Sequence, residues 1–348
     1  MTQQNQTKNP TIWQKLGVQW KTNPLFSTGC VLVLMIVLQT VALGFDFESL
    51  GAWFSHWSRN WINILRNNAS VGIVALGMTF VIISGGIDLA VGSTLVAVGA
   101  VLMVFVNSYP DGLLMSMGIT GPAAFAIGIA ACMLMGCLLG GVSGFLIARQ
   151  KLPAFIATLG MMKICRSVTQ QVMQTAAVKV PSAFLKIANT KIGGQVILPI
   201  IYWLVIAVIL YIVSKKTTFG RHVYAIGSNE RTARLSGINV EKVTAMVYVL
   251  SGFLVSIAAV IQVARIGSMD YANAGSGYEM DAIAAVVVGG TSMSGGRGSI
   301  LGTVFGMLII AVMNNLLNLM GVPPFLREAF KGFIVVAAVL LQKKESSR

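Results

Sequence analysis

Long apolar runs separated by short polar segments occupy most of this chain. A helix that crosses a bilayer needs roughly 20 mainly apolar residues, and runs of about this length recur from residue 27 to residue 341. We expect about ten membrane-spanning helices, and the short run 280–292, which contains glycines, is also compatible with a re-entrant segment. The expected spans are 27–46, 69–87, 90–107, 122–148, 153–173, 197–214, 243–266, 280–292, 299–320 and 325–341.

The composition agrees with this pattern. Of the 348 residues, 55% are hydrophobic and only 10% are charged, whereas a soluble domain carries about 25% charged residues. We therefore expect an all-α integral membrane protein with one transmembrane domain, 27–341, between an N-terminal segment, 1–26, and a tail, 342–348. The polar start has no clear small-residue cleavage site, so the first span is expected to stay uncleaved.

The formal net charge of +14 raises nucleic-acid binding as an alternative. The Lys and Arg residues lie mainly beside the apolar runs, however, which is the distribution found in cytoplasmic loops rather than on a basic face. No nucleic-acid partner is therefore expected. With ten spans, both termini and the segment 215–242 fall in the cytoplasm. Lys179, Lys186 and Lys191 disagree because they fall outside, which leaves the topology of 150–196 open.

Residues suited to catalysis or cofactor binding are scarce. The chain has two histidines, His56 and His222, and its four cysteines lie in apolar stretches, so neither a metal cluster nor a disulfide is expected. The phosphate-binding pattern G-x-x-x-x-G-K-[ST] does not occur. We expect no bound cofactor and no ATP hydrolysis by this chain, and a membrane-embedded enzyme is the least favoured hypothesis.

A few polar groups between the apolar runs are candidate site residues. Gly85 and Gly86 can end one helix, and Asp88 can cap the next, although a carboxylate at membrane depth is also a common functional group. Asp281 has the same two interpretations. Capping is favoured for both aspartates, which places them at helix joints, and a position along a translocation path is the alternative.

Asn314 and Asn315 lie inside the span 299–320, where their amides need partners from neighbouring helices or from a polar path. Amides both donate and accept hydrogen bonds, as sugar hydroxyls do, so a neutral, polar substrate is favoured. An ion-coupled secondary transporter is the alternative, and it needs intramembrane carboxylates or broken helices that bind sodium.

Two pairs of segments resemble each other. SGGIDLAVGS (84–93) is similar to VGGTSMSGGRGS (288–299), and KLPAFIATLG (151–160) is similar to GVPPFLREAFKG (321–332). If spans two to five correspond to spans seven to ten, one half is inverted relative to the other, which is typical of transporters. The alternative is that glycine-rich turns recur in any multispan protein.

Glycines also recur at every fourth position in two spans. Such stripes allow helices to approach closely. Packing within the chain is favoured over a pore wall or a subunit contact. The glycines are Gly136, Gly140 and Gly144 in one span and Gly298, Gly302 and Gly306 near another.

The hydrophilic segment 215–242 contains a signal for a short helix. Asn229 is a candidate N-cap and Gly237 a candidate C-cap, which predicts roughly two helical turns between them. Such a helix suits docking into a groove of a soluble partner. The alternative is a solvated loop without a partner.

The motifs of these segments resemble the permease subunits of ABC importers for monosaccharides of the ribose, galactose, xylose and arabinose type. The resemblance rests on the motifs ALGMTFVIISGGIDLAVGS (75–93), PAFIATLGMM (153–162), FGRHVYAIGSNERTARLSGINV (219–240) and GSGYEMDAIAAVVVGGTSMSGGRGSILGTVFGMLIIAVMNNLLNLMGV (275–322). It implies a fold similar to importer permeases of the vitamin B12 type, with two inverted halves, in the bacterial cytoplasmic membrane.

The resemblance also implies partners. These are a cytoplasmic ABC ATPase subunit, a second permease copy or close relative, and a periplasmic or lipid-anchored sugar-binding protein, in a surrounding of membrane lipid. The segment 219–240 would contact the ATPase, although Arg231 and Thr232 replace alanines that are common in the family. Arg327 and Glu328 stand where a glutamine-containing stretch is common. The implied coupling residues are Glu230, Arg231, Ala233, Leu235, Ser236 and Gly237.

Overall fold

The computed structural model describes residues 24–45, 49–174, 176 and 178–346, and most of these are helical. A short hairpin is formed by β1 (Lys191–Ile192) and β2 (Gln195–Val196), which pair antiparallel. The helices are α2 (Pro24–Ala42), α3 (Leu50–Ile83), α4 (Val91–Val106), α5 (Gly121–Ala148), α6 (Ala154–Met173), α7 (Ser182–Asn189), α8 (Leu198–Lys216), α9 (Thr218–Ser228), α10 (Glu230–Leu235), α11 (Val240–Ile266), α12 (Tyr278–Val288), α13 (Ile300–Leu319) and α14 (Pro324–Ser346).

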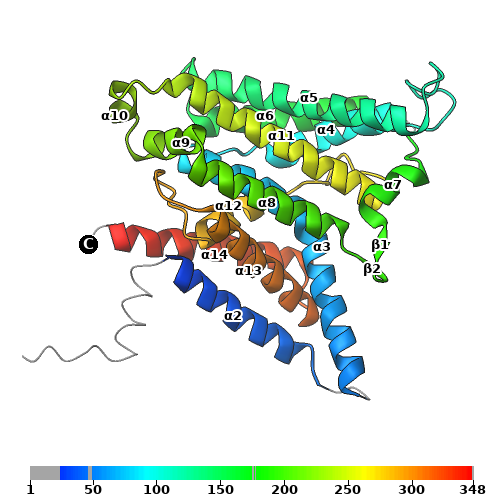
Figure 1. The fold of residues 1–348 in the computed structure, drawn as a ribbon, viewed down its shortest axis with the longest axis horizontal. Helices are drawn as coiled ribbons and strands as arrows, with labels where there is room; N and C mark the ends of the chain where they lie inside the picture. The colour runs from blue at the N-terminus through cyan, green and yellow to red at the C-terminus, as the bar shows by residue number, and fades with distance from the viewer. Residues whose placement is uncertain (1–23, 46–48, 175, 177, 347–348) are drawn as a thin grey trace, which may run out of the picture.

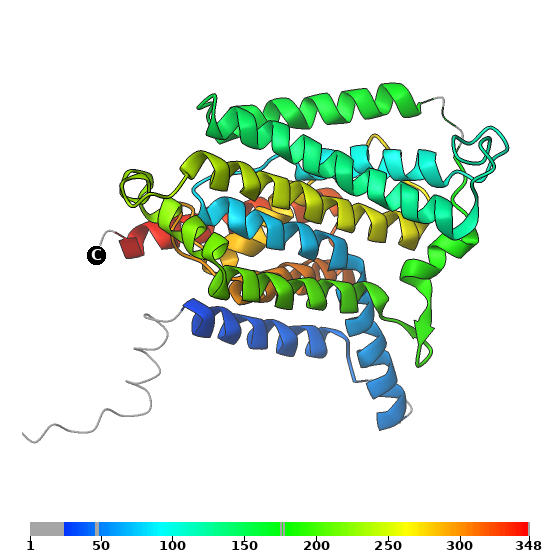
Figure 2. The same ribbon diagram turned by 45° about the horizontal axis from the view of Figure 1, so that its top comes forward.

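The long helices lie side by side in a bundle with two distinct ends (Figures 1 and 2). Helices α9 and α10 and the end of α14 lie at one end, which we call the α10 end. Helix α7 and the β1–β2 hairpin lie at the other end, which we call the α7 end. The bundle therefore ends in two surfaces built from different elements.

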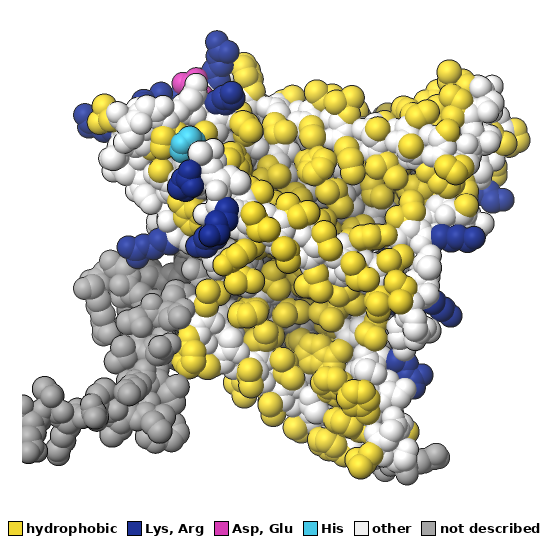
Figure 3. All heavy atoms as spheres, in the orientation of Figure 1, with side chains coloured by type: hydrophobic (Ala, Val, Ile, Leu, Met, Phe, Trp, Pro, Cys, Tyr) yellow, Lys and Arg dark blue, Asp and Glu magenta, His cyan; other side chains and the backbone are white. Residues whose placement is uncertain are grey.

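A broad apolar surface covers the middle of the bundle, and basic side chains lie toward its two ends (Figure 3). Large apolar side chains on α2, α5 and α8 are exposed, such as Leu34, Leu134 and Val208. In the described part of the chain, six helices are long and apolar enough to cross a membrane: α2, α3, α5, α8, α11 and α13. The expected all-α membrane architecture is confirmed.

All ten expected spans coincide with helices, but four of them do not have the length or hydropathy of a simple span. Helix α4 is apolar but has only 16 residues, and α12 has 11. Helix α6 carries charged and amide side chains, and α14 continues to Ser346, so most of the expected tail is helical. The expected N-terminal segment, 1–26, lies outside the described residues except for its last three.

Several elements were not predicted. Helix α3 begins at Leu50, 19 residues before the expected span, with Ser49 as its N-cap. Its first part carries Arg59 and Arg66, and these charges hide a helix from any test based on apolar runs. Helices α7 and α9 were missed because each is too short and too amphipathic to resemble a span.

The core lies where α3 and α11 cross the middle of the bundle, and it includes fully buried Tyr248 and Phe80. The glycine stripe of α5 packs against α11: a side chain at Gly140 or Gly144 would collide with the backbone of Tyr248 or Ala245. The stripe of α13 packs in the same way against α12. Packing within the chain, the favoured interpretation, is confirmed.

Candidate functional site

The short helix α10 forms where the capping residues predicted it. The Asn229 side-chain oxygen accepts a hydrogen bond from the Thr232 N–H at 2.9 Å, which caps the helix N-terminus. Gly237 follows the helix with φ of +80°, a left-handed conformation that costs glycine little. The Ile238 N–H then donates to the Ala233 carbonyl at 3.1 Å, which completes the helix end.

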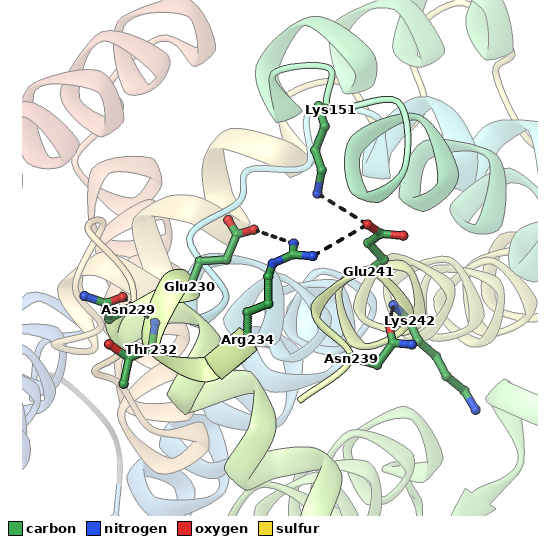
Figure 4. Close-up of polar contacts among 8 residues, drawn as sticks. All are labelled: Lys151, Asn229, Glu230, Thr232, Arg234, Asn239, Glu241 and Lys242. Atoms are coloured by element: carbon green, nitrogen blue, oxygen red, sulfur yellow. Dashed lines mark hydrogen bonds and ion pairs between the residues drawn. The ribbon is translucent and has the colours of Figure 1, made fainter. Parts of the chain in front are cut away.

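A network of three ion pairs links α10 to neighbouring segments, and one pair, Arg234 with Glu241, reaches directly from α10 to α11 (Figure 4). Arg234 lies 3.1 Å from Glu230 and 3.8 Å from Glu241 of α11, and Lys151 lies 4.0 Å from the same Glu241. All four side chains are about half exposed, so each pair contributes at most about 1 kcal/mol. Together they join α10 to the start of α11 and to the loop after α5.

The implied coupling residues divide into two groups by exposure. Leu235 is 82% exposed, which is unusual for a large apolar side chain next to a polar loop. The side chains of Glu230, Arg231 and Ser236 are also exposed, as is Gly237. Ala233 is different: it is only 3% exposed and packs inward. It therefore anchors α10 and does not belong to its exposed surface.

Helix α9 connects α10 to the end of α3 and to the loop after α12. Gly227 lies against the carbonyl oxygen of Ile83 at the end of α3, where a side chain would collide. The Gly296 N–H donates to the same carbonyl at 2.9 Å, and the Tyr224 hydroxyl donates to the Gly298 carbonyl at 2.9 Å. Any displacement of α9 therefore acts directly on the end of α3 and on the loop 289–299.

Two glycine turns have the same conformation. Gly85 ends α3 with φ of +87°, and Gly290 ends α12 with φ of +85°. The helix end predicted at Gly85 and Gly86 is confirmed. The proposed correspondence of 84–93 with 288–299 is wrong as a sign of inverted halves, however. Both turns lie at the α10 end and contact each other through Ile83 and Gly296, whereas inverted equivalents lie at opposite ends.

The short helices α4 and α12 begin inside the bundle. At 1.5 Å per residue they are about 24 Å and 16 Å long, short of the roughly 30 Å of a bilayer core. Helix α12 ends at the turn of the α10 end, whereas α4 ends at Asn107, whose side chain accepts from the Lys179 N–H at 2.9 Å near the α7 end. Their beginnings meet, because the Gly92 and Gly275 backbones touch.

The two aspartates lie beside these inner helix beginnings. Asp88 is buried, and its carboxylate accepts from the Ala90 N–H and from the Ser251 hydroxyl, each at 3.0 Å. It bonds the first turn of α4, but the N-cap residue itself is Ala90. These two hydrogen bonds give both oxygens of the buried side chain a partner.

Asp281 does not cap α12, contrary to expectation. Gly277 is the N-cap, and no side chain accepts there. The Asp281 carboxylate instead pairs with Lys331 of α14, whose Nζ lies 2.9 Å from Oδ1. Lys331 also contacts Glu328 at 2.9 Å. Sequence reasoning did not identify Lys331, because only the fold brings α14 to α12.

The two asparagines of α13 differ in their contacts. The Asn315 amide donates to the side-chain oxygen of Asn60 on α3 at 3.4 Å. The Asn314 side-chain oxygen is buried and makes no hydrogen bond within the described part of the chain. Asn315 therefore bonds a neighbouring helix. This is the first of the two interpretations of its amide, and it requires no polar path.

In the loop 267–277, Asp270 organises its own turn. Hydrogen bonds from the Asn273 side chain, and from the backbone N–H groups of Ala272 and Asn273, hold the pKa of Asp270 below its usual value. The carboxylate therefore stays ionised at neutral pH and keeps the loop in one conformation.

Comparison with known proteins identifies the family. Residues 60–339 match the family described as "Branched-chain amino acid transport system / permease component". The chain belongs to this permease family. The permease is therefore a membrane-spanning transport subunit rather than an enzyme, as the sequence predicted.

Relatives of the permease include named sugar permeases. The chain is 40% identical over 292 residues to the ribose import permease protein RbsC of Escherichia coli (strain K12). The matched region covers 82% of this chain and 86% of the relative. The chain is 38% identical to RbsC of Bacillus subtilis (strain 168) over 99% of both chains. It is 32% identical to the fructose import permease protein FrcC of Rhizobium meliloti, over 96% of this chain and 89% of that one. No solved structure matches the chain.

Proposed function

We propose that the permease is the transmembrane subunit of an ABC importer and forms, with a second permease copy or a close relative, the path for a monosaccharide. The observation that carries this proposal is the α10 surface: an exposed leucine on a capped helix, joined through Gly227 to the end of α3 and to the loop after α12. That arrangement transmits a displacement from a soluble partner to helix ends inside the bundle.

A monosaccharide is favoured as substrate for two reasons. The relatives are named for ribose, fructose and xylose, although the family description names branched-chain amino acids. The second reason is chemical: an amino acid needs partners for both its ammonium and its carboxylate, whereas a sugar needs only donors and acceptors such as amides and hydroxyls.

The sidedness belongs to the same proposal. The α10 end faces the cytoplasm and the ATPase, both termini lie there, and the α7 end faces outside, in a bacterial cytoplasmic membrane. Ten membrane-inserted helices then form two inverted halves similar to the vitamin B12 type, α3–α6 and α11–α14. The short helices α4 and α12, which begin at one internal contact and run to opposite ends, support this arrangement.

The α7 end is then the docking surface for an external sugar-binding protein. Lys179, Lys186 and Lys191 are exposed there. Among the described residues none of them forms an ion pair. Lysines in short outer loops run against the usual charge distribution, and acidic side chains of a partner explain their presence.

An ion-coupled secondary transporter is the second candidate, because buried carboxylates beside inner helix ends are typical of such proteins. The contacts count against it. Asp281 is neutralised by Lys331, and both oxygens of Asp88 accept hydrogen bonds from the protein. Each carboxylate is therefore already engaged by groups of the protein, which weakens its competition for a cation.

Reconstitution tests the proposal. The permease is placed in liposomes with its ATPase subunit and sugar-binding protein, and uptake of radiolabelled monosaccharide is measured with and without ATP. We expect uptake only with ATP and all partners, and no ATP hydrolysis by the permease alone. Uphill uptake driven by a sodium or proton gradient without nucleotide would exclude the ABC assignment.

A further inference from the structure

Helix α6 presents a polar face to its surroundings. It packs against α4 and α5 through a buried stripe formed by Ala157, Met161, Cys165, Thr169 and Met173. Away from this stripe lie polar side chains that are exposed or half-buried: Lys163, Arg166, Ser167, Gln170, Gln171 and Gln174. At 100° per residue these positions form one continuous arc along about 16 Å of helix.

The arc cannot face lipid. An amide or ammonium group in the hydrocarbon core has no water to bind, and each unsatisfied group costs several kcal/mol. Polar side chains on membrane helices therefore face the protein interior or a water-filled passage. In this chain the arc is exposed, so its neighbour is either water or another subunit.

An apolar, exposed strip of α6 lies directly beside this arc. Ile164, Val168 and Val172 are exposed and line an apolar groove of about 300 Å³ between α4, α5 and α6. Each of these residues follows an arc residue in sequence. Helix α6 thus has an apolar exposed side and a polar exposed side. The two sides differ in direction by about 100°, the rotation between consecutive helix residues.

Arg166 joins the arc to the loop before α12. Its Nη1 donates to the carbonyls of Tyr271, Ala272 and Ala274 at 3.3, 3.2 and 2.7 Å. The loop is held beside α6, with the side chains of Asn273 and Ser276 exposed. The loop that carries these two side chains is therefore attached to the polar arc of α6 through Arg166.

We propose that Lys163, Ser167, Gln170, Gln171 and Gln174, together with Asn273 and Ser276 of the loop, form the wall of the passage that contacts the sugar. This inference rests on the proposed function and deepens it by assigning residues. Glutamine amides donate and accept, as does a serine hydroxyl, so this wall matches a neutral polyhydroxylated molecule. Within the described part of the chain Lys163 forms no ion pair, and it is a donor only; α6 supplies no carboxylate to the wall, and the Asp270 carboxylate of the loop accepts from the Asn273 amide.

Paired cysteine substitutions test the inference. In a background without the four native cysteines, single cysteines replace Lys163, Ser167 or Gln171, and the matched controls replace the next residues, Ile164, Val168 or Val172. The complex with its ATPase is placed in nanodiscs, which leave both sides open, and treated with a charged thiosulfonate reagent. We expect labelling at the polar positions at least tenfold faster than at their apolar neighbours.

Two results would overturn the inference. Slow labelling at all six positions would mean that protein covers the arc, and equal labelling of both sides would mean that no single side faces the passage. The labelling measurement does not depend on transport. A failure of this inference can therefore be distinguished from a failure of the proposed function, in which the unlabelled complex shows no ATP-driven uptake at all.

A second measurement addresses contact with the sugar. Gln171→Leu removes donor and acceptor at nearly constant volume, and Gln171→Glu keeps the shape. We expect Gln171→Leu to slow uptake several-fold while ATP hydrolysis stimulated by the binding protein continues. Val172→Leu, one residue away, should leave both rates unchanged. Equal uptake by Gln171→Leu and the unsubstituted permease would exclude a role for this side chain in contacting the sugar.

Discussion

Gly227 of α9 lies against the carbonyl oxygen of Ile83, with no space for a side chain between them. The contact joins the segment that carries α10 to the end of a central helix. Gly227 therefore forms a direct contact between the segment that carries the proposed ATPase surface and the bundle.

Gly227→Val should therefore uncouple the permease. The added side chain must displace α9 from α3, and such overpacking costs about 1–3 kcal/mol. The exposed surface of α10 is unchanged, so the ATPase subunit should still bind. We expect ATP-driven uptake to fall at least tenfold while copurification of the ATPase persists.

The control for this variant is Gly29→Val in α2, where no atom lies within 4 Å of an added Cβ. It should leave uptake and ATPase binding unchanged. Normal uptake by Gly227→Val would show that the α9 contact does not transmit movement.

Gly237→Trp should disrupt ATPase docking itself. Gly237 has φ of +80°, and a side chain in the left-handed region costs roughly 1–2 kcal/mol, while the indole also blocks the exposed surface around Leu235. Membrane insertion should be normal and uptake lost. Gly237→Asn is the control, because asparagine tolerates this conformation; its uptake should stay within about twofold. Unchanged uptake by Gly237→Trp would count against docking at α10.

Breaking the pair of Asp281 and Lys331 should destabilise the permease. The side chains are only 12% and 13% exposed, and removing one partner of a buried pair costs about 3–5 kcal/mol. Asp281→Asn should therefore lower the temperature of unfolding in detergent, followed by the reactivity of buried Cys132. The exchange Asp281→Lys with Lys331→Asp should recover part of the loss.

An exposed pair provides the comparison for this measurement. Glu230→Gln removes the partner of Arg234 at 3.1 Å, and exposed pairs contribute about 0–1 kcal/mol. Its unfolding temperature should hardly change. If the two variants lost equal stability, the Asp281–Lys331 pair would have no special role in holding α14 against α12.

Local signals explain which features could be predicted from the sequence, and long-range contacts explain which could not. Helix α10 follows from Asn229 and Gly237 alone, because capping depends on groups within a few residues. The partners of Asp281 and Gly227 could not be found this way, since Lys331 and Ile83 approach only when distant helices pack. The polar face of α6 was visible as Lys163 and Arg166 within a span, but its meaning depends on which side of the helix is buried.

The lysines of the α7 end lead to a last prediction, about docking of the sugar-binding protein. If acidic groups of that protein meet Lys186 and Lys191, the double variant Lys186→Glu, Lys191→Glu should slow association by tenfold or more at low salt. The effect should shrink as ionic strength rises, because exposed charges are screened within about 10 Å at 0.1 M salt. Surface-immobilised permease in nanodiscs, with the binding protein flowed over it at several salt concentrations, provides the measurement. Asp111→Asn, in the loop between α4 and α5, removes a negative charge instead and should not slow association. Equal association rates for the double variant and the unsubstituted permease at low salt would show that the basic α7 end is not the docking surface.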